Sequence, residues 1–227
     1  MDRDTIARCL PFIIYMAFVG VQEGLGWLGA RGLIGYDDNT ARFLYPVKIA
    51  LVTLALLVLW KRYSEVRFKG LSLSDTLLSV AVGLVVFVLW INMDWPFAVF
   101  GEMEGYDPGI SGGGTAPLAL LSVRLFGASV IVPLMEEIFW RSFLLRYIIN
   151  PDFMAVQIGR FTAVSFVIST VLFGLEHNMF LAGMMAGAAY TLLLYRTKSI
   201  AQSVIAHGIT TLALGIYVIN TGQWRFW

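Results

Sequence analysis

The sequence predicts an all-α polytopic membrane protein, a helical bundle with about seven transmembrane helices. Of its 227 residues, 58% are apolar and 14% are charged, and the mean hydropathy is +0.76. Soluble domains are about 45–50% apolar and about 25% charged, so a soluble core of this size would not bury so much apolar surface. Apolar runs of about 20 residues, the length that crosses a bilayer as a helix, recur along the chain.

Seven segments fit this length. The first could be a secretory signal peptide, but no small-residue cleavage site follows it, so we interpret it as a helix. The fourth is too long for one straight crossing, and Pro133 in its middle predicts a kink or two half-helices. The segments cover residues 9–28, 40–60, 74–95, 117–149, 161–180, 181–196 and 199–219.

The whole chain, residues 1–227, is expected to be a single membrane domain. Three N-terminal spans occupy 1–95, a loop on the outer side occupies 96–116, and a second group of spans with polar motifs occupies 117–227. Within the loop, Gly109–Gly114 is expected to be a plain connection rather than a substrate lid. Basic loops stay on the cytoplasmic side, and four basic residues follow the second span, which predicts a cytoplasmic N-terminus if the spans alternate. These are Lys61, Arg62, Arg67 and Lys69.

Charge and composition limit the partners. Sixteen basic and fifteen acidic residues give a net charge of +1, so no field attracts the protein to nucleic acid. Cys9 is the one cysteine of the sequence, so it cannot form an intramolecular disulfide.

Gly183-x-x-x-Gly187 predicts close helix packing within the bundle rather than dimerisation, and the sequence does not define an oligomeric state. Aromatic residues near span ends are expected to anchor the protein at the membrane interface: Trp27, Trp60, Trp90, Trp95, Trp224, Phe226 and Trp227.

Two adjacent glutamates stand inside the fourth apolar segment. An ionisable side chain in a membrane helix costs about 2.5–3.5 kcal/mol, so each needs a partner or a function. Glu137 and Arg141 are spaced i,i+4 with the acid first, which predicts an ion pair. Glu136 points about 100° away and lacks a local partner, so it is a candidate general base. The alternative is a structural network in which both acids pair with Arg141 and with Arg146 or Arg124.

The two histidines of the sequence also lie in apolar segments. His177 shares a helix face with Phe173 at i,i+4, and His207 is followed one turn later by Thr211. A single histidine in an apolar helix is more often a packing residue. Because both histidines occupy segments other than that of the glutamates, we favour a polar centre where these segments meet.

A carboxylate, two imidazoles and a hydroxyl fit hydrolysis of a peptide bond by water. This reaction needs an activated water, an acid for the leaving amine and donors for the developing oxyanion. The sequence has no Gly-x-Ser-x-Gly elbow, Gly-rich phosphate loop or His-Glu-x-x-His helix. Serine hydrolases, P-loop enzymes and ordinary zincins therefore have no motif support.

The three polar segments together resemble the CAAX protease and bacteriocin-processing family of intramembrane endopeptidases. Its motifs are Glu-Glu-x-x-x-Arg, Phe-x-x-x-His and His-x-x-x-Asn/Asp, and their order and spacing agree here. The chain is similar in particular to the bacterial exosortase-associated branch. The resemblance implies an enzyme of the bacterial inner membrane that cleaves a membrane-anchored protein or peptide. The similar stretches are Pro133–Arg146, Asn150–Phe153, Phe173–His177 and Thr221–Trp227.

The resemblance also implies a role for each motif residue. Glu136 would activate the hydrolytic water together with His177, which belongs to the same motif as Phe173. Glu137 with Arg141 would hold the geometry of the site.

The third motif departs from the family. The resemblance implies that His207 forms part of the oxyanion hole, assisted by the residue four positions later. Thr211 stands there, where the family usually has Asn or Asp. A Thr hydroxyl can donate one hydrogen bond, but it lacks the reach of an amide.

The sequence is compatible with alternatives for both the cofactor and the function. We expect no cofactor because no closely spaced histidine pair is present, although two histidines and a glutamate are also a plausible zinc set. A second function is a non-catalytic scaffold or accessory protein of a protein-sorting system with a degenerate protease site, which Thr211 favours. A third, a transporter with a Glu/His proton relay, lacks readable inverted halves.

Overall fold

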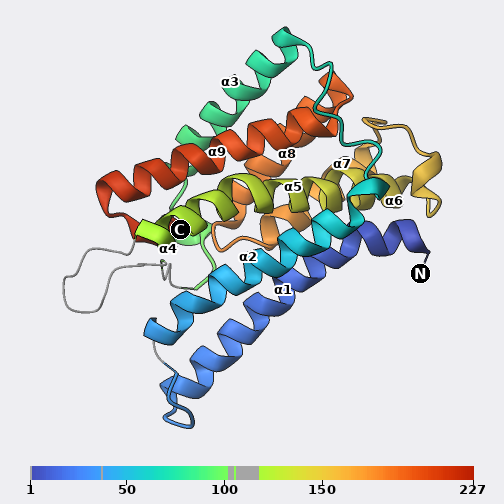
Figure 1. The fold of residues 1–227 in the computed structure, drawn as a ribbon. Coiled ribbons are helices and arrows are strands. Elements are labelled where there is room, and N and C mark those ends of the chain that lie inside the picture. The colour runs from blue at the N-terminus through green and yellow to red at the C-terminus, as the bar shows by residue number, and fades with distance from the viewer. Residues whose placement is uncertain (1, 37, 102–104, 106–117) are drawn as a thin grey trace.

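In the computed structural model, every predicted segment is helical, and the described residues form no strand. The structure describes residues 2–36, 38–101, 105 and 118–227, without the side chains of 38–42. The predicted connection at Gly109–Gly114 lies outside these residues. The long helices run side by side along one direction (Figure 1).

The N-terminal half contributes a helical hairpin and a third helix. The hairpin consists of α1 (Arg3–Ala30) and α2 (Asp38–Leu59), and the side chain of Asp2 caps α1 by accepting from the Thr5 amide at 2.7 Å. The third helix, α3 (Leu73–Trp90), packs against the last long helix, α9 (Ile200–Thr221) (Figure 1). Short 3₁₀ turns lie between or after the long helices. They are η1 (Trp60–Arg62), η2 (Pro96–Ala98), η5 (Phe153–Ala155) and η6 (Trp224–Phe226).

The fourth segment is one continuous helix interrupted by two π-helical stretches. The interruption predicted at Pro133 thus takes the form of π turns, not of two half-helices. Proline has no N–H, so the carbonyl of Ser129 loses its helical partner, and a π turn accommodates that loss. The pieces are α4 (Leu118–Phe126), η3 (Gly127–Ile131), α5 (Val132–Glu137), η4 (Ile138–Leu144) and α6 (Leu145–Ile149).

The next two helices form a close hairpin, α7 (Ala163–Leu175) and α8 (Phe180–Thr197). A Cβ on Gly183 would lie 2.9 Å from the Cα of Gly174, so these glycines let the two helices touch. The predicted packing of the Gly183 motif within the bundle is confirmed.

The protein is an integral membrane protein with five helices long and apolar enough to cross a bilayer. They are residues 3–30, 43–62, 73–90, 118–149 and 200–221. The prediction of seven crossings is therefore approximate, because α7 has only 13 residues and α8 is not among the five.

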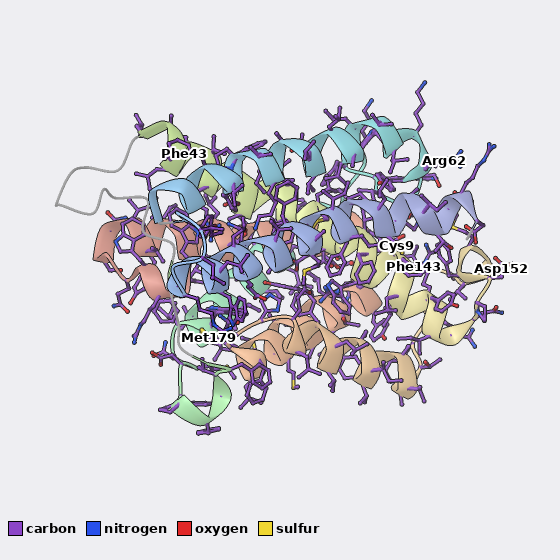
Figure 2. The ribbon with its side chains drawn as sticks, turned by 90° about the horizontal axis from the view of Figure 1, so that it is seen from below. Cys9, Phe43, Arg62, Phe143, Asp152 and Met179 are labelled. Atoms are coloured by element: carbon purple, nitrogen blue, oxygen red, sulfur yellow. The ribbon has the colours of Figure 1, made fainter. Side chains whose placement is uncertain are left out.

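Polar contacts gather at one end of the bundle, where Figure 2 labels Arg62 and Asp152, opposite the end with Phe43 and Met179. Fully buried Arg8 donates to both carboxylate oxygens of Glu65 at 2.9 Å, and Arg146 lies 3.9 Å from the same carboxylate. Arg146 therefore pairs with Glu65 and not with the glutamates of α5.

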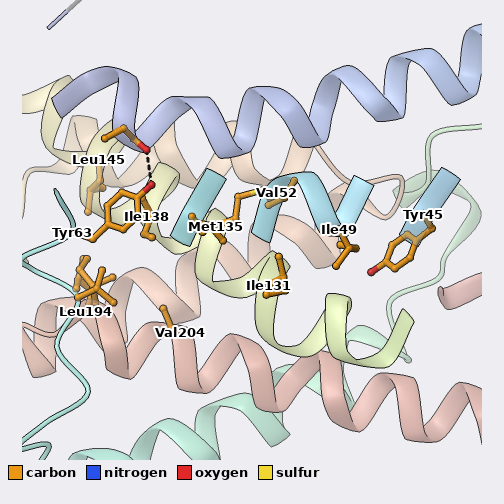
Figure 3. Close-up of a cluster of buried hydrophobic side chains, with 14 residues drawn as sticks. Tyr45, Ile49, Val52, Tyr63, Ile131, Met135, Ile138, Leu145, Leu194 and Val204 are labelled. Carbon is orange, nitrogen blue, oxygen red and sulfur yellow. Dashed lines mark hydrogen bonds between the residues drawn. The ribbon is translucent and has the colours of Figure 1, made fainter. Parts of the chain in front are cut away.

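The main apolar core joins α1 and α2 to α5, η4 and α9 (Figure 3). At one edge the Tyr63 hydroxyl donates to the Ala7 carbonyl at 2.7 Å and ties α1 to the turn after η1. The side chains that fill the core include Ile49, Val52, Ile131, Met135, Ile138, Leu194 and Val204.

α9 packs closely against the π turn η3, and this contact fixes the position of the neighbouring residues of α9. A Cβ on Gly208 would lie 2.7 Å from the Ser129 carbonyl oxygen, which Pro133 has freed. We expect Gly208→Ala to lower the free energy of unfolding by about 1–3 kcal/mol, the usual cost of overpacking. Thermal unfolding in detergent checks this, with Gly20→Ala as the control because a Cβ there meets nothing within 4 Å. Equal melting temperatures for both variants would contradict the contact.

Candidate active site

A cavity of about 210 Å³ opens inside the bundle and brings together residues from seven helices, with residues 118–149 counted as one helix. Glu136, His177, His207 and Thr211, the four predicted catalytic residues, all line it. They reach it from α5, the turn after α7, and α9. Its walls also include Tyr15, Tyr45, Trp90, Tyr190, Phe226 and Trp227.

Three of these aromatic residues have a contact that the sequence did not predict. Trp90, Phe226 and Trp227, which were expected as interfacial anchors, form walls of the cavity. The chain reverses after α9 at Gly222, whose φ of +69° suits glycine, and this brings Trp227 back against α9 beside Gly215.

Glu137 is held by the ion pair that its spacing with Arg141 predicts. The two side chains are 0% and 2% exposed, and Arg141 Nη1 lies 3.1 Å from Glu137 Oε1. Arg141 also donates to the Gly187 carbonyl at 3.2 Å and lies 4.4 Å from the ring centre of Phe173. The i,i+4 ion pair is confirmed, and it fastens the long helix to α7 and α8.

Glu136 has a different environment from its neighbour. It is 4% exposed, and within the described residues its carboxylate accepts no hydrogen bond. Its Oε2 lies 3.9 Å from His207 Nε2, too far for a direct hydrogen bond but a separation that one water bridges. The alternative interpretation of the sequence, in which arginines pair with both glutamates, therefore does not hold for Glu136.

The hydrogen bonds of the histidines define which nitrogen faces the cavity. His177 Nδ1 lies 2.8 Å from the Phe173 carbonyl, which can only accept, so Nδ1 carries the proton and Nε2 is left for the cavity. His207 Nδ1 lies 3.0 Å from Glu137 Oε1, and the carboxylate paired with Arg141 accepts there. In both rings Nε2 is therefore the nitrogen available to a substrate or water.

Aromatic rings fix the planes of both imidazoles. Tyr190 stacks on His207 with ring centres 4.8 Å apart, and its hydroxyl donates to Thr210 at 2.8 Å. Trp90 packs edge to face against His177 at 5.4 Å. The imidazoles are thus held before any substrate arrives.

Thr211 lines the cavity, but its hydroxyl is already engaged. Its oxygen lies 3.1 Å from the His207 carbonyl and 3.3 Å from that of Gly208, so the single proton goes to the backbone of α9. To assist His207, this hydroxyl would have to leave these carbonyls.

One connection between the motifs was not predicted from the sequence. Trp140, one turn after Glu136, donates through Nε1 to Glu176 Oε2 at 3.0 Å, and Glu176 immediately precedes His177. This hydrogen bond ties the glutamate helix to the turn that carries His177. The sequence signal was the ionisable Glu176 in an apolar segment, which needs a partner.

The three candidate zinc ligands do not form a ligand set. Among the described residues, no group of three or more His, Cys, Asp or Glu side chains is placed to hold a metal ion. His207 Nε2 and Glu136 Oε2, 3.9 Å apart, face each other without a third close donor of this kind.

Comparison with known families matches the part of the chain that carries these motifs. Residues 118–213 match the family model described as type II CAAX prenyl endopeptidase, Rce1-like. The comparisons with curated proteins and with solved structures find no match. The segment with the three motifs thus matches the Rce1-like family model, while the exosortase-associated branch stays a prediction.

Proposed function

We propose that the Rce1-like segment, residues 118–213, gives this membrane protein the activity of an intramembrane endopeptidase. It would hydrolyse a peptide bond of a membrane-associated protein or peptide with a water that Glu136 and His177 activate. The observation that carries this proposal is the contrast within the glutamate pair. Glu137 is bound to Arg141 and His207, whereas Glu136 faces the cavity without a hydrogen-bond partner among the described residues.

The proposed reaction begins with a water held between Glu136 and the unprotonated Nε2 of His177. Glu136 accepts a proton from the water. At the same time the oxygen of this water attacks the scissile carbonyl carbon, and a tetrahedral oxyanion forms. As the C–N bond breaks, the proton on Glu136 passes to the leaving amine. Water is consumed, and a carboxyl and an amine are formed.

His207 is the proposed donor to the oxyanion. In its protonated form Nδ1–H donates to Glu137 and Nε2–H points toward Glu136 and the cavity. Glu137 and Arg141 act by fixing the position and charge of this imidazole. Thr211 would assist only after turning its hydroxyl from the α9 carbonyls.

The place of the cavity within the bundle supports a substrate that approaches through the lipid bilayer. The helices around it are apolar on their outer surfaces, with side chains such as Leu57, Val85 and Val167 more than half exposed. A lipid-anchored or membrane-spanning peptide fits this access better than a soluble one. We propose a bacterial inner-membrane location with the N-terminus in the cytoplasm, on the basis of the basic loops.

The test uses the full-length protein in lipid nanodiscs with a library of quenched fluorescent peptides, each anchored in the bilayer by a hexadecyl chain. We expect cleavage of part of the library by the wild type and none by Glu136→Ala or His177→Ala. Glu23→Ala, an exposed acid of α1, is the control and should cleave like the wild type. Absence of cleavage by the folded wild type would overturn the proposal and favour the non-catalytic scaffold. Cleavage that survives both changes in a folded protein would overturn it too, because other residues would then activate the water.

The proposed mechanism needs no metal ion, which gives a separate prediction. We expect 1,10-phenanthroline and EDTA to leave the cleavage rate unchanged, because the residues of the cavity do not form a ligand set. Metal analysis of the purified protein should find less than one zinc per chain. A loss of activity that added zinc restores would contradict this.

A further inference from the structure

We propose that Tyr15 of α1 is a further catalytic residue, whose hydroxyl donates a hydrogen bond to the oxyanion of the tetrahedral intermediate. This inference rests on the proposed function, and it concerns a residue outside the segment that matches the protease family. The need for such a donor follows from Thr211, whose hydroxyl proton is committed to carbonyls of its own helix. Oxyanion holes commonly combine several donors, and His207 supplies one.

The register of α1 against the long helix brings Tyr15 to the level of Glu136. Two contacts set this antiparallel register: Arg8 Nε lies 3.2 Å from Ser142 Oγ, and the rings of Phe12 and Phe139 stack with centres 3.9 Å apart. Tyr15 follows Phe12 by three residues, and Glu136 precedes Phe139 by three. Three residues are about one helical turn, so the side chains of Tyr15 and Glu136 lie at the same height on the two facing helices.

The Tyr15 hydroxyl is available to a substrate. Tyr15 lines the same cavity as Glu136 and His207, and it is half-buried. Within the part of the chain that the structure describes, this hydroxyl has no hydrogen-bond partner, whereas the hydroxyls of Tyr63 and Tyr190 have partners at 2.7 and 2.8 Å. A phenol that lines a cavity and has no protein acceptor can donate its proton to an oxyanion.

Lys48 of α2 explains how the membrane-buried Tyr15 becomes a strong donor. Its ammonium lies 4.3 Å from the centre of the Tyr15 ring and is 4% exposed. Its hydrogen bond goes to the neutral amide of Gln22, at 3.3 Å. A lysine within a membrane helix is costly and needs a function. A positive charge beside the ring stabilises the negative charge that develops on the phenol oxygen as it donates, and so strengthens the hydroxyl as a donor, which makes Lys48 a positioning residue that acts through Tyr15.

The test compares Tyr15→Phe with wild type on an anchored peptide that the library identifies. We expect kcat to fall by about 10²–10³, the usual loss for one oxyanion donor, with KM changed less than threefold. A peptide aldehyde, whose hydrate resembles the tetrahedral intermediate, should bind more weakly by the same factor as kcat/KM falls. Tyr147→Phe, at an exposed position of α6 away from the cavity, is the matched control and should behave as wild type.

Variants at the two neighbouring positions separate this role from a structural one. Lys48→Met should lower kcat by about tenfold without changing the melting temperature, and Lys48→Arg should restore it because the charge returns. Thr211→Val should change kcat less than Tyr15→Phe does. If Lys48→Met lowered only the melting temperature, or Thr211→Val had the larger effect, the assignment of the donor would be wrong.

Comparison of Tyr15→Phe with Glu136→Gln distinguishes a wrong role for Tyr15 from a wrong function for the protein. A Tyr15→Phe protein whose kcat stays within twofold of wild type, while Glu136→Gln on the same peptide loses about 10²–10⁴ in kcat, overturns the role of Tyr15 alone. A wild type that cleaves no peptide, or a Glu136→Gln protein that cleaves normally, overturns both.

Discussion

Replacing Glu136 with glutamine is expected to lower kcat by about 10²–10⁴, the contribution that a positioned general base makes. The amide keeps the size of the side chain and its place beside His207, but it cannot take a proton from water. Substrate binding is not expected to change, so KM should stay close to that of the wild type. Steady-state cleavage of an anchored peptide in nanodiscs measures both constants.

The control for this variant is Glu23→Gln, an isosteric change at an exposed acid of the same protein. Its kcat should equal that of the wild type. Because Glu136 has no hydrogen-bond partner among the described residues, its replacement should also leave the melting temperature within a few degrees. A Glu136→Gln protein that cleaves within tenfold of the wild-type rate would show that another group activates the water.

Replacing Arg141 with methionine is expected to destabilise the protein by about 3–5 kcal/mol, the usual cost of breaking a buried ion pair from one side. The change leaves Glu137, which is fully buried, without the cation at 3.1 Å and removes the donor to the Gly187 carbonyl. Equilibrium unfolding in mixed micelles of dodecylmaltoside and SDS measures the loss. Arg160→Met is the control, because Arg160 is exposed and has no ion pair in the described structure.

Removing both charges separates stability from activity. The double variant Glu137→Leu with Arg141→Met should recover part of the lost stability, since a buried pair replaced by apolar side chains is often neutral. It should be inactive even where it is folded, because His207 loses the carboxylate that holds its Nδ1. An Arg141→Met protein that unfolds like the wild type would contradict the structural role of the pair.

Hydropathy alone predicted most of the fold. The segments expected at 199–219 and 161–180 are the helices Ile200–Thr221 and Ala163–Leu175. The π turns could not be predicted in the same way. They depend on how the carbonyl freed by Pro133 packs against α9 at Gly208, a contact between residues about 80 positions apart, and local periodicity carries no information on it.

The four residues that the sequence predicted for the site line one cavity in the structure. The i,i+4 spacing assigned Arg141 to Glu137 and left Glu136 unpaired, as the structure has them. The catalytic roles themselves stay predictions. Tyr15 could not be assigned to the site from the sequence, because it lies on a helix about 120 residues before Glu136 and carries no motif.

The claim that Glu136 and His177 act on one water is tested most directly by a double-variant cycle. Glu136→Gln, His177→Gln and the combined variant are compared by kcat on the same anchored peptide, at matched fractions of folded protein. Residues that activate a single water act as a unit, so the combined variant should be no slower than the slower single variant by more than a few fold. Losses that multiply in the combined variant, or a His177→Gln protein as fast as the wild type, would contradict a shared water.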